Sequence, residues 1–108
     1  MYDKLLIKNG RINNMEISKS REGDICFLGE LNIYNVKEVK SHLDNILREN
    51  PAKIRLDLSG IKDIDTSCIQ LLLSLKKLAK SKGIDYKLVN PSEVVKEAFR
   101  LAGMLKKE

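Results

Sequence analysis

The sequence predicts a single α/β domain in which three main helices pack on a mixed β-sheet of about four to five strands. The chain has 108 residues, a length typical of one domain with one core. Strand-like alternation and helical periodicity follow one another in the order strand, strand, helix, strand, helix, strand, helix. No repeat or flexible linker interrupts this order, so we divide the chain only into an N-terminal segment, residues 1–14, and the domain, residues 15–108.

The first elements are expected to be short strands. In the N-terminal segment, Asn9-Gly10 lies between apolar runs, and both residue types tolerate positive φ, so a short hairpin is expected there. Residues 15–19 then alternate apolar and polar, residues 21–24 are turn-like, and residues 25–28 are a compact apolar run. This pattern predicts two strands joined by a turn.

The first helix is expected to begin at Asn35. This residue can cap it, with Glu38 three residues later as in a capping box, and Asn50-Pro51 ends it. The apolar face of this helix is expected to consist of Val36, Val39, Leu43, Ile46 and Leu47.

Two further strands are expected on either side of a second helix. Residues 54–58 alternate apolar and charged side chains, and Ser59-Gly60 is expected to break this strand. Residues 84–89 form the next strand.

The second helix begins at Asp65-Thr66-Ser67, where three side chains are candidate caps, and it ends at Gly83. Gln70 stands three residues after Ser67 and completes a capping box with it. The buried face is expected to be Cys68, Leu71, Leu72, Leu75, Leu78 and Ala79. The polar stripe facing solvent is expected to be Ser67, Gln70, Ser74, Lys77 and Ser81.

The third helix is expected to start within Asn90-Pro91-Ser92-Glu93, with proline in its first turn, and Gly103 can cap its end. Its apolar face is expected to consist of Val94, Val95, Ala98, Leu101 and Ala102.

The sequence offers no catalytic or metal-binding motif. His42 is the single histidine and is expected to be a solvated helix residue rather than a catalytic base. Cys26 and Cys68 form no CxxC pair and are expected to be reduced thiols. There is no glycine-rich phosphate loop. We therefore expect a protein that is not an enzyme and has no metal and no cofactor.

The net positive charge of the chain comes from its second part. Residues 1–65 hold 11 basic and 11 acidic side chains, whereas residues 66–108 hold 9 basic and 4 acidic ones. Lysine dominates this basic part and aromatic residues are few, so a solvated lysine face is expected rather than nucleic-acid binding. With no long apolar run and no signal peptide, we expect no membrane insertion and a cytoplasmic location.

The densest group of polar side chains is residues 63–67, Asp-Ile-Asp-Thr-Ser, between an expected strand and an expected helix. One interpretation is that Asp65 or Ser67 caps the helix and the others are solvated. The other interpretation is that a hydroxyl at this helix N-terminus carries phosphate, because free N–H groups and the helix dipole tolerate the added anion.

Three segments of the chain resemble the motifs of STAS domains, the family of bacterial anti-sigma factor antagonists and of sulfate-transporter tails. Residues 56–72, LDLSGIKDIDTSCIQLL, resemble the central motif. Residues 28–32, LGELN, are similar to the G-E-L-D segment before the first helix, and NPS at 90–92 through AGM at 102–104 is similar to the last helix and the turn after it. The resemblance covers roughly residues 15–105 and implies the STAS fold.

The resemblance also implies a site. In the family, the second hydroxyl residue of D-[ST]-[ST]-G is the serine phosphorylated by a partner kinase that also acts as anti-sigma factor. That residue is Ser67 here, with Thr66 beside it and Asp65 supporting the loop. The chain departs from the motif at Cys68, where glycine is usual, and at Asn32, where aspartate is usual. The expected partner-binding residues are Asn32, Asp65, Thr66, Ser67, Cys68, Gln70 and Ser74.

The function implied is that of a non-enzymatic regulatory protein, similar to an anti-sigma factor antagonist, which binds a cytoplasmic serine kinase or related signalling kinase and is switched by phosphorylation of Ser67. A related version places it in a chemotaxis or two-component-like cluster. The alternative is a cytoplasmic STAS subunit of a lipid-transport ABC complex, which would contact the ATPase through the Thr66–Ser67 face without phosphorylation. Oligomeric state is not predicted.

Overall fold

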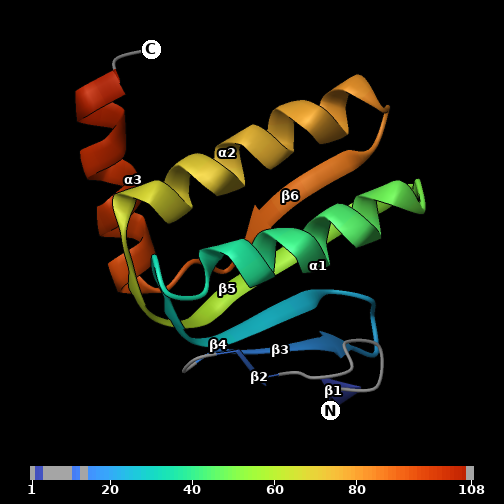
Figure 1. Ribbon diagram of the computed structural model, residues 1–108, viewed down its shortest axis with the longest axis horizontal. Coiled ribbons are helices and arrows are strands. Elements are labelled where there is room, and N and C mark those ends of the chain that lie inside the picture. Colours follow the sequence, from blue (N-terminus) through green and yellow to red (C-terminus); the bar gives the residue numbers. More distant parts are fainter. Residues whose placement is uncertain (1, 4–10, 13–14, 107–108) are drawn as a thin grey trace.

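After a run of strands at the start of the chain, helix and strand alternate as predicted, and the helices lie against one sheet (Figure 1). The computed structural model describes residues 2–3, 11–12 and 15–106. The strands are β1 (Tyr2–Asp3), β2 (Arg11–Ile12), β3 (Met15–Ser20), β4 (Ile25–Leu31), β5 (Lys53–Ile64) and β6 (Asp85–Val89). The helices are α1 (Val36–Arg48), α2 (Thr66–Ser81) and α3 (Glu93–Lys106). The predicted fold class is confirmed, with four main strands and two two-residue strands in the part described.

The sheet is mixed because its connections differ. A tight turn joins β3 to β4, with Gly23 at a φ of +94°, so these strands are antiparallel. A helix lies in each connection from β4 to β5 and from β5 to β6, so these three strands are parallel. The strand order is β1-β3-β4-β5-β6, and β2 also pairs with β3. The predicted hairpin turn at Asn9-Gly10 lies outside the described residues.

The core forms where the apolar faces of the strands and helices meet. The largest fully buried side chains come from β3, β4, β5 and all three helices: Phe27, Met15, Ile17, Leu31, Leu47, Leu56, Leu58, Ile61, Ile69, Leu72, Val39 and Val95. Both cysteines are free, as expected, and both are buried. The predicted faces of α1 and α2 are therefore largely confirmed.

Two leucines assigned to buried helix faces are exposed instead. Leu78 of α2 is 41% exposed and Leu101 of α3 is 48% exposed. Each residue turns a helix by about 100°. The buried positions of α2, which include Leu71, Leu72, Leu75 and Ala79, span a wide face, and Leu78 lies just beyond its edge. On α3, Leu101 lies about 100° away from the buried Ala102 and outside the core.

The central strand β5 is longer than predicted, because Ser59-Gly60 does not break it. A Cβ atom on Gly60 would stand 2.4 Å from the carbonyl oxygen of Phe27. The register between β4 and β5 shifts at this point, between Cys26 and Leu28. Glycine is therefore needed here for a close approach of two strands at a bulge rather than for a turn.

The helix ends also differ in part from the prediction. Gly83, at a φ of +74°, follows the end of α2 as predicted. Gly103 does not end α3, which continues to Lys106. That helix begins at Glu93, after Pro91, because the Ser92 hydroxyl oxygen accepts the Val95 N–H at 3.4 Å.

Candidate functional site

The predicted site lies where the loop between β4 and α1 meets the start of α2. Both segments follow parallel strands, so both lie at the carboxyl edge of the sheet (Figure 1). The Asp65 N–H donates to the carbonyl oxygen of Leu31 at 3.3 Å, which joins the two segments directly. Residues more than thirty positions apart are therefore neighbours here.

Asp65 is the cap of α2, and its carboxylate joins both segments. Its extended backbone places it before the first helical residue. Oδ1 accepts the Cys68 N–H at 3.2 Å and the Ser67 hydroxyl at 2.7 Å, and Oδ2 accepts the Ile33 N–H at 3.1 Å. Desolvation raises the pKa of Asp65, but hydrogen bonds from Ser67, Cys68 and Ile33 together outweigh it, so the pKa is lower than its ordinary value.

Ser67 does not cap the helix, and the capping box predicted with Gln70 does not form. Because Asp65 occupies the cap, Ser67 is the second helical residue, and its hydroxyl donates to Asp65. Its side chain is exposed, as is that of Thr66. The predicted polar stripe of α2 is exposed along its whole length: Ser67, Gln70, Ser74, Lys77 and Ser81.

Cys68 follows Ser67 but points the other way. Its side chain is fully buried in the core and takes no part in the exposed surface. Burial raises the pKa of its thiol to about 12. A side chain larger than hydrogen is thus accommodated at the usual glycine position without covering Ser67.

Asn35 organises the loop rather than capping α1. Its side chain makes no cap hydrogen bond and is fully buried. Its Oδ1 accepts the Asn32 N–H at 3.0 Å, and its Nδ2 donates to the carbonyl oxygen of Glu30 at 2.8 Å. The Asn32 side chain in turn accepts the Tyr34 N–H at 2.9 Å. These two asparagines hold the loop in a fixed conformation.

That loop displays two large apolar side chains that our sequence reasoning missed. Ile33 is 68% exposed and Tyr34 is 78% exposed. Their only signal in the sequence is their position between two asparagines just before a helix. We call the exposed group next to Asp65 the α2 N-terminal surface: Ile33, Tyr34, Thr66, Ser67, Gln70 and Ser74, with the half-buried Asn32 at its margin.

We also searched the described residues for metal-binding clusters and membrane-spanning helices. These residues contain no cluster of three His, Cys, Asp or Glu side chains that could hold a metal ion, and no helix among them is long and apolar enough to span a membrane.

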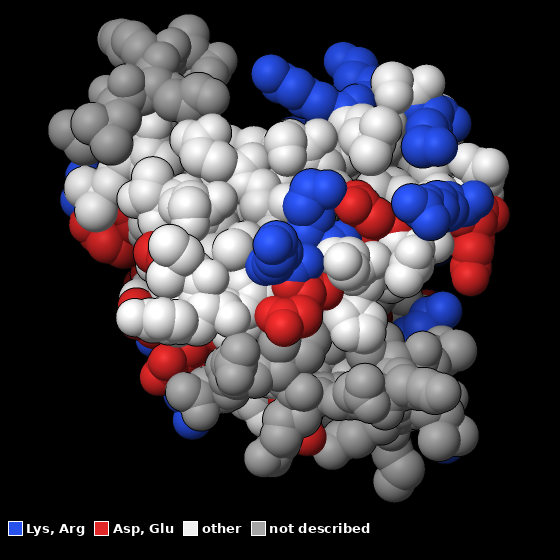
Figure 2. Space-filling model, viewed as in Figure 1, with Lys and Arg blue, Asp and Glu red and all other residues white. Residues whose placement is uncertain are grey.

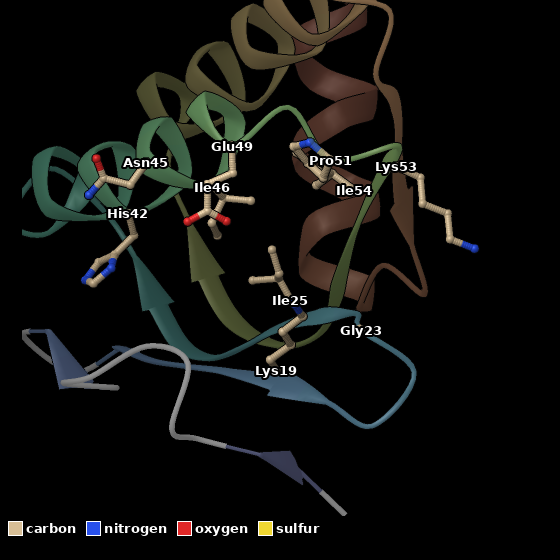
Figure 3. Close-up of a pocket in the computed structure, with 10 residues that line it drawn as sticks. All are labelled: Lys19, Gly23, Ile25, His42, Asn45, Ile46, Glu49, Pro51, Lys53 and Ile54. Carbon is tan, nitrogen blue, oxygen red and sulfur yellow. The ribbon is translucent and has the colours of Figure 1, made fainter.

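His42 lies half-buried on α1, where it lines a cavity of about 350 Å³ together with Lys19, Ile25 and Glu49 (Figure 3). This cavity lies at the amino ends of β4 and β5, and none of the predicted site residues lines it.

Comparisons with known proteins agree with this fold. No curated protein sequence matches the chain. The unphosphorylated anti-sigma factor antagonist SpoIIAA superimposes with a TM-score of 0.65 at 16% identity, over 83% of this chain and 81% of that one. A STAS-domain anti-sigma factor antagonist from Rhodobacter sphaeroides gives a TM-score of 0.59 at 20% identity, over 80% of this chain and 98% of that one.

The family assignment rests on the sequence itself. The model of the STAS domain matches residues 19–108, which includes every element from β4 to α3 and the whole α2 N-terminal surface. The chain belongs to the STAS domain family.

Proposed function

We propose that this domain is a non-enzymatic regulatory protein that binds a serine kinase acting as an anti-sigma factor, and that phosphorylation of Ser67 releases that partner. The single observation that carries the proposal is the position of Ser67, whose exposed hydroxyl lies in the first turn of α2, 2.7 Å from the carboxylate of the cap. The likeness of the fold to anti-sigma factor antagonists supports the choice of partner. Such partners are cytoplasmic, so we propose the same location.

The proposed partner contact combines apolar and polar groups. Ile33 and Tyr34 offer apolar side chains that an interface can bury, and the polar stripe of α2 begins beside them. A phosphate on Ser67 adds about two negative charges at the centre of this surface. Burying an unpaired charge is costly, so the same surface would bind the partner more weakly after phosphorylation.

The hydrogen bonds of Asp65 suggest how the phosphate acts locally. Phosphorylation removes the hydroxyl proton that Ser67 donates to Asp65 and places an anion beside that carboxylate. The helix dipole and the free N–H groups of α2 favour the phosphate, whereas the Asp65 carboxylate repels it. The same carboxylate holds the Ile33 N–H, so repulsion there weakens the tie that positions the apolar side chains.

We expect a serine kinase of ATPase fold to be encoded beside this protein, and that kinase is the partner used in the test. The wild-type domain is incubated with that kinase and ATP, and the phosphate is mapped by mass spectrometry. Ser67→Ala and Ser67→Asp are then compared with the wild type for kinase affinity, with the neutral Ser67→Asn as a control for size. We expect phosphate on Ser67, tight binding by Ser67→Ala, and weak binding by Ser67→Asp only.

A matched control lies on the same helix stripe. Ser74 is also exposed, but its hydroxyl donates to the Leu71 carbonyl oxygen rather than to a carboxylate. Ser74→Ala should leave phosphorylation unchanged. Phosphate on Ser74 or elsewhere, or full affinity in Ser67→Asp, would reject the proposed switch.

The exposed apolar loop also favours a second candidate. A cytoplasmic STAS subunit of a lipid-transport ABC complex would grip its ATPase by contact through Ile33, Tyr34 and the Thr66–Ser67 face, with no change in charge. An ATPase encoded with a permease beside this protein, bound equally by phosphorylated and unphosphorylated forms, would select this candidate.

A further inference from the structure

The last strand of the sheet leaves one edge of its backbone free. Among the strands that the structure describes, β6 pairs only with β5, in a parallel register that aligns Asp85 with Lys53 and Val89 with Asp57. The Asp85 N–H donates to the Ala52 carbonyl oxygen at 3.1 Å. Backbone groups of alternate residues point to opposite sides of a strand, so those of Tyr86 and Leu88 point away from β5. Within the described part of the chain, no hydrogen bond satisfies them on that side.

The free edge has a defined length, because α3 takes the place of β6 beyond it. The Ser92 N–H donates to the Leu58 carbonyl oxygen at 3.4 Å, and the Ser92 hydroxyl donates to the Ile61 carbonyl oxygen at 2.7 Å. The edge of β5 is thus covered where β6 ends. What stays open is the five-residue strand β6.

A groove of about 300 Å³ runs along this open edge, lined by Lys76 of α2 and by Tyr86, Lys87, Leu88 and Val89. Tyr86 faces α2, since its hydroxyl donates to the Leu72 carbonyl oxygen at 2.9 Å. Side chains alternate along a strand, so Lys87 projects from the opposite face of the sheet. The two lysines therefore flank the edge from both faces.

Two further lysines lie toward the start of β6, beyond the residues that line the groove. Lys80 lies one helical turn beyond Lys76, and Lys53 is aligned with Asp85 at the start of β6; all of these lysines are exposed. Lysine and arginine side chains gather over the C-terminal half of α2 at the top right of Figure 2. Asp85 is the single acidic residue of β6. The charge around the edge thus matches an acidic occupant.

We propose that the free edge of β6 binds an acidic, extended segment of a partner protein, which adds to the sheet as a further strand. Backbone hydrogen bonds to Tyr86 and Leu88 would hold the segment in register, and Lys76 and Lys87 would select acidic side chains on both of its faces. This surface is separate from the α2 N-terminal surface, and neither Ser67 nor its phosphorylation is needed for it.

The probe is the peptide acetyl-Val-Glu-Glu-Val-Glu-Glu-Val-amide, which presents glutamates on both faces of an extended strand, with the whole protein labelled with ¹⁵N. We expect saturating peptide to slow hydrogen exchange of the Tyr86 and Leu88 amides by about tenfold or more. The Lys87 amide, which points toward β5, is the internal control and should change little. Peptide binding that leaves the Tyr86 and Leu88 amides unprotected would overturn the proposal.

Charge selection is tested with matched variants. Lys76→Glu combined with Lys87→Glu should weaken peptide binding by about tenfold, whereas Lys62→Glu, an exposed lysine on the far half of β5, should not. Thermal unfolding of each variant confirms that it is folded. Two other results would contradict the proposed occupant: protection of the same amides by self-association in sedimentation experiments without peptide, or equal binding of a DNA oligonucleotide to this edge.

Discussion

At the scale of single residues, Asp65 should stabilise the fold at the site more than Ser67 does. Its two oxygens accept three hydrogen bonds, from the start of α2 and from the loop before α1. Asp65→Ala removes the cap and the tie to Ile33, and should lower the free energy of unfolding by about 2 kcal/mol. Ser67→Ala removes only a bond to the cap and should cost about 0.5 kcal/mol or less.

Urea unfolding of the two variants checks this ranking. Asp63→Ala is the control, because Asp63 is an exposed carboxylate two residues before Asp65, and among the described residues it accepts only the N–H of the next residue, Ile64. Asp63→Ala should lower the free energy of unfolding by as little as Ser67→Ala does. A larger loss in Ser67→Ala than in Asp65→Ala would mean that the serine, not the aspartate, stabilises the start of α2.

The lowered pKa of Asp65 gives a second prediction at this scale. The pKa lies below its ordinary value of 3.8 in the folded protein, so the ionised form stabilises the fold. This contribution is complete above the unfolded-state value and is lost as pH falls through the lower folded-state value. The difference in unfolding free energy between wild type and Asp65→Asn should therefore shrink below about pH 4.

Unfolding free energies of both proteins between neutral pH and about pH 2.5 measure this difference. The other carboxylates titrate in both proteins, so their contributions cancel in the difference between the two unfolding free energies. A difference that stays constant down to the lowest pH would show that the Asp65 charge does not contribute.

At the scale of elements, the length of β5 depends on one glycine. A Cβ on Gly60 would meet a backbone oxygen of β4, which cannot move without breaking the sheet. Gly60→Ala should therefore lower the free energy of unfolding by about 2–3 kcal/mol. Gly103→Ala is the matched control, because nothing lies within 4 Å of its Cβ position inside α3, and it should stabilise the protein by about 0.5–1 kcal/mol.

Chemical unfolding of both alanine variants decides whether Gly60 is needed for strand contact. Equal and small effects would mean that β4 and β5 can separate at the bulge without loss.

The elements also show what the sequence could predict. Helix faces follow from a period of 3.6 residues, which is a local property, so the burial of Leu72, Leu75 and Ala79 was predictable. The sequence left Asp65 and Ser67 as candidate caps of α2, and in the structure Asp65 is the cap, because its carboxylate accepts the Cys68 N–H. The role of Gly60 and the bond between Asp65 and Ile33 depend on contacts between residues that are distant in the sequence. A local pattern contains no information about such contacts, so the strand break predicted at Ser59-Gly60 was wrong.

At the scale of the whole molecule, the parallel topology assembles the site. Two crossover connections bring the loop before α1 and the start of α2 to one edge of the sheet, so Ile33 comes to lie beside Asp65. The resemblance to STAS motifs located Ser67, but the apolar side chains beside it became visible only once the two segments were joined.

This arrangement predicts that Ile33 contributes to partner binding and not to stability. Ile33→Ser keeps the backbone N–H that Asp65 holds and should change the free energy of unfolding by less than about 0.5 kcal/mol. It should weaken binding of the kinase by about tenfold. Leu101→Ser, at an exposed leucine on α3, is the control and should leave affinity unchanged. Isothermal titration of both variants compares them, and equal affinities would exclude the loop from the interface.

The central claim is that Ser67 controls partner binding from the surface of an unchanged fold. The most direct measurement is the dissociation constant between the kinase and the domain, before and after stoichiometric phosphorylation at Ser67, with circular dichroism on both forms. We predict an increase of about a hundredfold or more in the dissociation constant, since a buried unpaired charge costs several kcal/mol, with no change in helix content. An unchanged dissociation constant, or a loss of affinity that accompanies unfolding, would contradict the account.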